Sequence, residues 1–285
     1  MSTIPLIDIE QVSYSYSAAN STPVAALREV SLRIERGEYI ALLGHNGSGK
    51  STLARHCNAL LVPDSGRVLV AGNDTRDQRI RREVRDHVGM IFQNPDNQII
   101  ATVVEDDVAW ALAVRGLPAP LIRERVDWAL AATGIAELRD RAPHQLSGGQ
   151  RQRLAIAGVL ALRPDAIIAD EATAMLDPLA RRATLDLLHA LNREYGLAII
   201  LVTHLLEEAA RAQRVVVLEH GQIAFDGTPA AVLANLEQMR HLKLAIPAPI
   251  ELAARLRAAG IPLHSAALTV EAIADALLHT DFQAR

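Results

Sequence analysis

The sequence has one cysteine, no hydrophobic run long enough to cross a membrane and no excess of positive charge. Cys57 alone cannot form an internal disulfide and fits a reducing, cytosolic compartment, and its apolar neighbourhood predicts a buried structural thiol. The longest apolar runs, 154–162 and 197–202, are far shorter than the roughly 20 residues of a spanning helix. A net charge of −4 provides no general attraction to nucleic acid.

We also expect no secretory signal, because the first ten residues contain Asp8 and Glu10 and lack a basic start. Half of the 285 residues are hydrophobic, which allows a sizeable core. The length predicts one large domain, or one domain with an appendage. The expectation is a soluble protein that meets a membrane only through partner subunits.

The order of predicted strands and helices indicates an α/β fold. Segments 7–16 and 30–34 alternate apolar and polar residues, which is typical of antiparallel strands, whereas 166–169 and 198–202 are apolar throughout, as buried parallel strands are. Helical spacing over 179–195 predicts the crossover between these two parallel strands. The other predictions are strands over 38–43, 88–92, 215–219 and 223–225, an inserted helical subdomain with helices over 104–114 and 121–132, a helix capped by Thr228 and Pro229, and two short helices over 250–259 and 270–278.

A glycine-rich segment of the form G-x-x-x-x-G-K-[ST] follows the apolar strand 38–43 and opens a helix. Its glycines let backbone N–H groups approach phosphate oxygens, and the helix offers its positive end to the same anion. Lys50 is expected to reach the β- and γ-phosphates of ATP, and the Ser51 hydroxyl to bind Mg²⁺. The ATP-binding residues predicted from this segment are Gly44, His45, Asn46, Gly47, Ser48, Gly49, Lys50, Ser51 and Thr52.

Polar side chains follow three of the predicted buried strands. Asp170 and Glu171 end the strand 166–169, where two carboxylates are unfavourable unless they meet a metal or a reacting group. Asp170 suits the Mg²⁺ shell, and Glu171 suits the base that positions the attacking water. Gln93 and His204 would be ordinary residues in isolation, but their order in the chain predicts contacts with the γ-phosphate, with His204 also holding Glu171. The predicted catalytic residues are Glu171, His204 and Gln93, and the predicted metal ligands are Ser51, Gln93 and Asp170.

A second anion site is predicted where another helix begins, in the sequence LSGGQ formed by Leu146, Ser147, Gly148, Gly149 and Gln150. One chain thus carries two binders for a γ-phosphate. Either both close on one ATP within a monomer, or two chains pair head to tail and each ATP lies between one chain's phosphate loop and the other chain's LSGGQ. The sequence geometry alone leaves both arrangements open.

These motifs, in this order, resemble those of the ATP-binding-cassette ATPases over about residues 7–240. The resemblance implies a P-loop NTPase fold with a mostly parallel core sheet, an antiparallel β subdomain, a helical insertion and a small C-terminal helical extension. It adds Tyr16, expected to stack on adenine, and a sandwich dimer in which residues 146–150 and Asp177 serve the ATP of the partner subunit. The expected domains are 1–240 for the ATPase, with a helical subdomain at about 94–163, and 241–285 for an extension that contacts the dimer partner.

A narrower resemblance is carried by segments 92–98 (FQNPDNQ) and 170–178 (DEATAMLDP), which are similar to those of energy-coupling-factor transporter ATPases. Ala172 stands where the wider family more often has proline, and the tail 247–285 is similar to the extension of this group. The resemblance implies uptake of a vitamin or transition-metal ion, with ATP and Mg²⁺ as cofactors. The implied partners are a second ATPase chain, identical or paralogous, a transmembrane coupling subunit and a substrate-binding membrane subunit, with no nucleic acid; the implied location is peripheral, on the cytoplasmic face of the cell membrane.

Three other functions share part of this pattern. The ATPase of a solute-binding-protein-dependent importer has every core motif and differs only in the Gln93 loop, the 174–177 turn and the tail. A non-transport cassette in DNA repair or translation usually needs a long coiled-coil insertion or tandem cassettes, and the sequence has neither. A non-catalytic regulatory cassette is opposed by the presence of Glu171 and His204.

Overall fold

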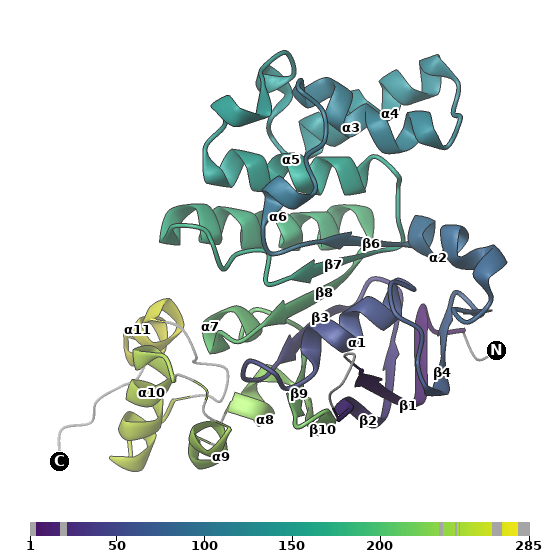
Figure 1. Ribbon diagram of the computed structural model, residues 1–285. Coiled ribbons are helices and arrows are strands. Elements are labelled where there is room, and N and C mark those ends of the chain that lie inside the picture. The colour runs from purple at the N-terminus through teal and green to yellow at the C-terminus, as the bar shows by residue number, and fades with distance from the viewer. Residues whose placement is uncertain are drawn as a thin grey trace.

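The computed structural model describes residues 4–17, 22–233, 236–242, 244, 246–263 and 270–278, which form two β-sheets with helices on both sides (Figure 1). The strands are β1 (Ile7–Tyr16), β2 (Val24–Ile34), β3 (Tyr39–Leu43), β4 (Ser65–Val70), β5 (Asn73–Asp74), β6 (Val88–Ile91), β7 (Ala166–Asp170), β8 (Ala198–Thr203), β9 (Arg214–Glu219) and β10 (Gln222–Gly227). The α-helices are α1 (Lys50–Cys57), α2 (Arg81–His87), α3 (Val104–Val114), α4 (Ala119–Ala132), α5 (Gly148–Leu160), α6 (Pro178–Tyr195), α7 (Leu206–Ala209), α8 (Pro229–Leu233), α9 (Leu236–His241), α10 (Ala248–Ala258) and α11 (Val270–Leu278).

The smaller sheet is antiparallel, with strand order β2-β1-β4-β5, as the alternating segments predict. β2 is longer than the predicted strand 30–34, because it begins at Val24. The first half of β2 is irregular. Its pairing with β1 shifts register between Val30 and Leu27, and Glu29 there has a positive φ of 51°. A bulge of this kind breaks the alternation of inward and outward side chains, so the simple pattern fails before residue 30.

The larger sheet has strand order β10-β9-β3-β8-β7-β6, and all its neighbouring strands are parallel except the hairpin β9–β10. The predicted parallel strands and the crossover helix α6 between them are therefore confirmed. Successive residues of β3 face opposite sides of the sheet. Tyr39, Ala41 and Leu43 enter one hydrophobic core, whereas Ile40 and Leu42 enter the other.

These two cores give the molecule its layers. One core lies between the two sheets and encloses α1. The other packs the far face of the larger sheet against helices that include α5 and α6, and α3 and α4 stack on α5 (Figure 1). Cys57 at the end of α1 is fully buried in the first core, and burial raises the pKa of its thiol to about 12. The prediction of a buried cysteine is confirmed.

The C-terminal helices form a smaller cluster of their own. Ala253 of α10, Ile273 of α11 and Leu263 of the segment after α10 are buried together, while Met239 and Ile250 join the core on the helix-covered face of the larger sheet. The predicted division at residues 240–241 and the bounds of the helical subdomain stay predictions. Residues 264–269 and 279–285 of the predicted extension lie outside the described residues. Within the part of the chain that is described, no helix has the length and apolarity to cross a bilayer.

Candidate phosphate and magnesium site

The predicted phosphate loop joins β3 to α1 at the carboxyl end of the larger sheet. Gly49, which precedes α1, has a left-handed φ of 106°, and a Cβ there would lie 2.6 Å from the carbonyl oxygen of Ala26. Gly47 is also left-handed, with a φ of 82°, but a Cβ there would meet nothing within 4 Å. Gly49 therefore fits the loop against β2, while Gly47 leaves open space on the side where phosphate is expected.

The turn between β9 and β10 is hydrogen-bonded to the phosphate loop. The Gly221 N–H donates to the carbonyl oxygen of Ser48 at 3.0 Å, and the Gly221 carbonyl accepts from the N–H of Arg28 at 2.8 Å. One residue thus links the phosphate loop to β2 of the other sheet. The ring of His45 packs against the ring of His220 in the same turn, with centroids 5.7 Å apart.

Gly49→Ala is expected to lower the free energy of unfolding by about 1–3 kcal/mol, because a non-glycine residue is strained at this φ and its Cβ would meet a backbone carbonyl. ATP affinity should fall as well, since the loop must shift to relieve the contact. Chemical denaturation and equilibrium ATP binding measure the two effects.

Gly158→Ala is the matched control: it lies in α5, a Cβ there meets nothing within 4 Å, and a stability gain of about 0.5–1 kcal/mol is expected. A Gly49→Ala chain as stable as the wild type would contradict the role given to this close approach.

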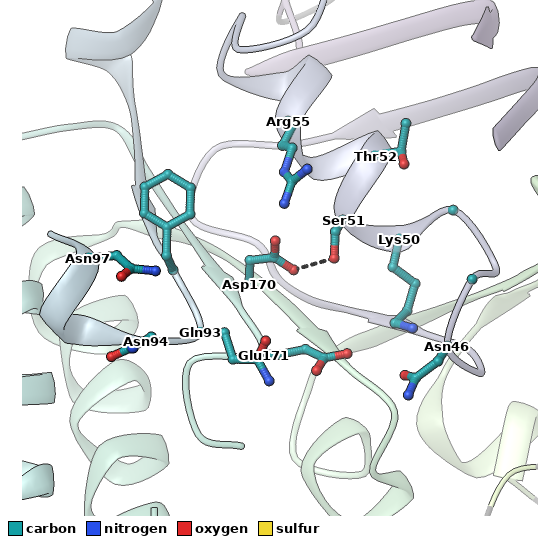
Figure 2. Close-up of a pocket in the computed structure, with 13 residues that line it drawn as sticks. Asn46, Lys50, Ser51, Thr52, Arg55, Gln93, Asn94, Asn97, Asp170 and Glu171 are labelled. Atoms are coloured by element: carbon teal, nitrogen blue, oxygen red, sulfur yellow. Dashed lines mark hydrogen bonds between the residues drawn. The ribbon is translucent and has the colours of Figure 1, made fainter. Parts of the chain in front are cut away.

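A cavity of about 700 Å³ opens above the loop and brings together predicted residues from three separate segments. Figure 2 shows Lys50, Gln93 and Glu171 directed into the same space. The Lys50 ammonium donates to the carbonyl oxygens of Gly44 at 2.9 Å and His45 at 3.0 Å. Burial lowers its pKa, and the carboxylates of Glu171 and Asp170 oppose that shift. The cavity is lined by Asn46, Gly47, Gly49, Lys50, Ser51, Thr52, Arg55, Phe92, Gln93, Asn94, Asn97, Asp170 and Glu171.

Ser51 and Asp170 meet inside this cavity, although 119 positions separate them in the sequence. The Ser51 hydroxyl donates to Oδ1 of Asp170 at 2.7 Å (Figure 2). Burial raises the pKa of Asp170, and the hydrogen bond from Ser51 and the nearby charge of Arg55 oppose the increase. A hydroxyl and a buried carboxylate side by side are the oxygen ligands that Mg²⁺ prefers, so the residues present fit that ion.

Glu171 directly follows β7 and has the left-handed φ of 49°, which is unusual for a glutamate. Its N–H donates to the carbonyl oxygen of Val202 at 3.0 Å, so the strained residue is tied to the end of β8. His204 follows β8, and its Nδ1 lies 3.5 Å from Oε1 of Glu171. The two side chains are therefore close, but His204 Nδ1 makes no hydrogen bond within the described part of the chain, and the holding of Glu171 by His204 stays a prediction.

Tyr16 lies at the end of β1 and is 41% exposed. Its hydroxyl lies 3.2 Å from Oγ1 of Thr52, and its ring meets Tyr14 edge to face at 5.0 Å. Tyr14 in turn packs edge-on against the buried His56 of α1. These contacts hold an exposed aromatic ring beside the phosphate loop, and the stacking of adenine on it stays a prediction.

The LSGGQ segment lies elsewhere on the surface. Ser147 caps α5 in a reciprocal arrangement, in which its hydroxyl accepts from the Gln150 N–H at 3.3 Å and its N–H donates to the Gln150 side chain at 2.8 Å. A Cβ on Gly149 would lie 3.0 Å from Cβ of Ala180, so this segment adjoins the start of α6, which Asp177 caps. Residues 146–150 and Asp177 are not among the described residues that line the cavity. That they serve the ATP of a partner subunit stays a prediction.

Four lining residues were not predicted from the sequence: Arg55, Phe92, Asn94 and Asn97. Arg55 follows Ser51 by four residues on α1, so helical spacing places both on one face of that helix. That signal was available, because Ser51 was already assigned to the site. Of the predicted loop residues, Gly44, His45 and Ser48 support the loop from outside the lining.

Comparison with known proteins agrees with this geometry. The model of the ABC transporter family matches residues 27–174. The chain is 51% identical over 279 residues to the energy-coupling factor transporter ATP-binding protein EcfA1 of Symbiobacterium thermophilum, covering 96% of this chain and 97% of that protein. Among solved structures, cbiO1 from Clostridium perfringens, described as part of the ABC transporter complex cbiONQ, is 37% identical with a TM-score of 0.75 over 87% of this chain and 98% of that one. A dimeric post-hydrolysis state of the ATP-binding cassette MJ0796 with ADP and Pi is 29% identical, with a TM-score of 0.70 over 78% and 98%.

Proposed function

Because the chain belongs to the ABC transporter family, among the ATP-binding proteins of energy-coupling factor transporters, we propose that its ATP hydrolysis powers uptake of a vitamin or transition-metal ion. The single observation that carries the catalytic part is the cavity in which Lys50, Asp170 and Glu171 meet. The relatives' names favour this class over the solute-binding-protein importers, the DNA-repair and translation cassettes, and the regulatory cassettes. The proposed location is the cytoplasmic face of the membrane, held there by partners.

Binding of ATP is assigned to the phosphate loop. Backbone N–H groups around Gly47 and Gly49 and the first turn of α1 receive the phosphates, and Lys50 exchanges its loop carbonyls for phosphate oxygens. Ser51 and Asp170 would hold Mg²⁺, with Gln93 at the edge of the same shell. When bound, the ion supplies neutralisation of charge on the β- and γ-phosphates.

Hydrolysis is assigned to Glu171 and His204, which directly follow β7 and β8. Glu171 would accept a proton from the attacking water or orient it, and its left-handed backbone directs the side chain into the cavity. His204, 3.5 Å away, would hold the Glu171 carboxylate and contact the γ-phosphate. Both are fixed by strands of the larger sheet, which keeps the reacting groups positioned.

The partner subunit is proposed to complete each site. Ser147 lies outside the cavity of its own chain, and the neighbouring Met175 and Leu179 are 64% and 79% exposed. Large apolar side chains beside a free helix N-terminus suit a surface that is covered when two chains meet. The solved relative MJ0796 is a dimer, which supports this arrangement.

A membrane subunit is proposed to dock on the helical subdomain. Val104, Val108 and Leu112 of α3 are buried and form helical core, but Ile100, Trp110 and Val114 are 60%, 54% and 64% exposed. A nearby hollow of about 480 Å³ lies between the Gln93 loop and the segment before LSGGQ. There Arg151 of α5 forms an ion pair with Asp96 at 3.1 Å, so a partner seated here would touch both ATP-contacting segments. The lining of the hollow is Asp96, Ile99, Ala101, Thr102, Pro143, His144 and Arg151.

The test is to isolate the tagged full-length chain from detergent-solubilised native membranes and identify the subunits that come with it. We expect a multi-span coupling protein and a small membrane protein that binds the solute, together with ATPase activity. A Trp110→Glu variant should lose the membrane proteins and keep ATP binding. Recovery of the chain with DNA or ribosomes instead would contradict the transport function.

A further inference from the structure

A buried glutamate outside the cavity connects the two loops that carry the reacting residues. Glu208 lies on the short helix α7 and is 1% exposed. Oε1 of its carboxylate accepts from the Thr173 hydroxyl at 2.6 Å, and Oε2 accepts from the Thr203 hydroxyl at 2.7 Å. Both threonines are themselves 2% exposed. One carboxylate thus bridges two segments that come from different strands.

The bridged threonines are immediate neighbours of the catalytic pair. Thr173 follows Glu171 by two residues, in the loop after β7, and Thr203 directly precedes His204 at the end of β8. The Thr203 hydroxyl also accepts from the N–H of Leu205 at 3.0 Å, which fixes the turn that follows His204. Movement of either loop would therefore stretch a hydrogen bond to Glu208.

Stability alone does not explain a carboxylate at this place. Burying a carboxylate is costly, and the nearest cation, Arg181, has its Nε 3.9 Å from Oε1, beyond hydrogen-bond distance. A well-packed apolar group is often as stabilising as a buried charge, whereas short hydrogen bonds donated to both carboxylate oxygens impose a defined geometry. Glu171, with its left-handed φ, keeps that strained backbone only if its surroundings determine it.

We infer that Glu208 is a positioning residue for ATP hydrolysis, which holds Glu171 and His204 at their working separation through Thr173 and Thr203. It touches no part of the cavity itself. The inference rests on the proposed roles of Glu171 and His204. In addition to those roles, the Glu208 carboxylate joins the loop after β7 to the loop after β8 by hydrogen bonds.

Glu208→Met tests this inference, because methionine keeps the length of the side chain and removes both acceptors. With the full-length chain isolated together with its partner subunits, we expect kcat for ATP hydrolysis to fall about 10- to 100-fold, because a small displacement of the reacting groups lowers the rate strongly. The KM for ATP should stay within about twofold, because the phosphate loop is untouched. Glu207→Met is the matched control on the same helix, where the side chain is 60% exposed, and should hydrolyse ATP normally.

Variants at Thr173 separate hydroxyl from shape. Thr173→Val should lower kcat, and Thr173→Ser should keep it near the wild-type value. The comparison is of kcat, so the two variants need not have the same melting temperature. Glu208→Met added to Glu171→Gln should lower the residual rate by less than about twofold, because Glu208 acts through Glu171. A normal kcat for Glu208→Met, equal losses for the valine and serine variants, or a full multiplicative loss in the double variant would each overturn the inference. If Glu171→Gln itself hydrolyses ATP normally, the proposed catalytic assignment fails instead.

Discussion

Glu171→Gln is expected to lower kcat for ATP hydrolysis by about 10³-fold while ATP still binds. Glutamine keeps the size of the side chain and its place in the cavity, but it cannot accept a proton from the attacking water, and such general-base contributions are worth about 10² to 10⁴. Lys50, Ser51 and Asp170 are unchanged, so the ATP-bound dimer should form and persist. Steady-state hydrolysis and size-exclusion chromatography with ATP measure the two halves of the prediction.

The control for this variant must match its unusual backbone. Glu29 is also a glutamate with a left-handed φ, of 51°, and lies on β2 outside the cavity lining. Glu29→Gln should leave both kcat and dimer formation unchanged. Hydrolysis by Glu171→Gln at close to the wild-type rate would remove Glu171 from the role of base.

Mixing two inactive variants is expected to restore activity if Ser147 serves the neighbouring chain. Ser147→Arg places a bulky cation at the cap of α5 and should abolish hydrolysis in a dimer of identical chains, as Glu171→Gln does. In a mixed dimer, one site combines the intact Glu171 of the first chain with the intact Ser147 of the second. That site should work, giving up to about half the wild-type rate per mixed dimer, a gain of several hundredfold over either variant alone if each is reduced about 10³-fold.

The opposite arrangement predicts the opposite result. If Ser147 and Glu171 of one chain served the same ATP, every site in the mixed dimer would carry one defect and activity would stay at background. Re-mixing Ser147→Arg with wild-type chains measures the efficiency of subunit exchange and serves as the control. If the dimer consists of two paralogous chains, the experiment compares two versions of that dimer. In one version both changes are made in the same chain, and in the other version each chain carries one of them.

The residues with local sequence signals were predictable. The loop from Gly44 to Ser51 predicts phosphate binding by itself, because its glycine spacing and its lysine meet the geometric requirement for phosphate within eight residues. The parallel strands and their crossover helix follow from apolar runs that the fold buries on both faces. Ser51 meets Asp170 because α1 begins beyond the carboxyl end of β3 and Asp170 ends β7, two parallel strands with only β8 between them in the sheet.

The features that depend on long-range contacts were not predictable. The left-handed φ of Glu171 arises from its tie to Val202, and no local pattern encodes such a tie for a glutamate. Glu208 is adjacent in sequence to the exposed Glu207, so charge alone suggests two surface acids on one helix turn. Only the packing of α7 reveals which of the two is buried. The separation of Ser147 from the cavity likewise belongs to the three-dimensional fold.

The two hydrogen bonds of Gly221 have a mechanical consequence. Its N–H and its carbonyl belong to two successive peptide groups that meet at one Cα, and they are bonded to the phosphate loop and to β2 respectively, so a displacement of β2 would reach the loop through a single residue. The same antiparallel sheet carries Tyr16 at the end of β1, beside the expected adenine. We therefore expect the base and the phosphates of a bound nucleotide to be held by parts of the chain that move together.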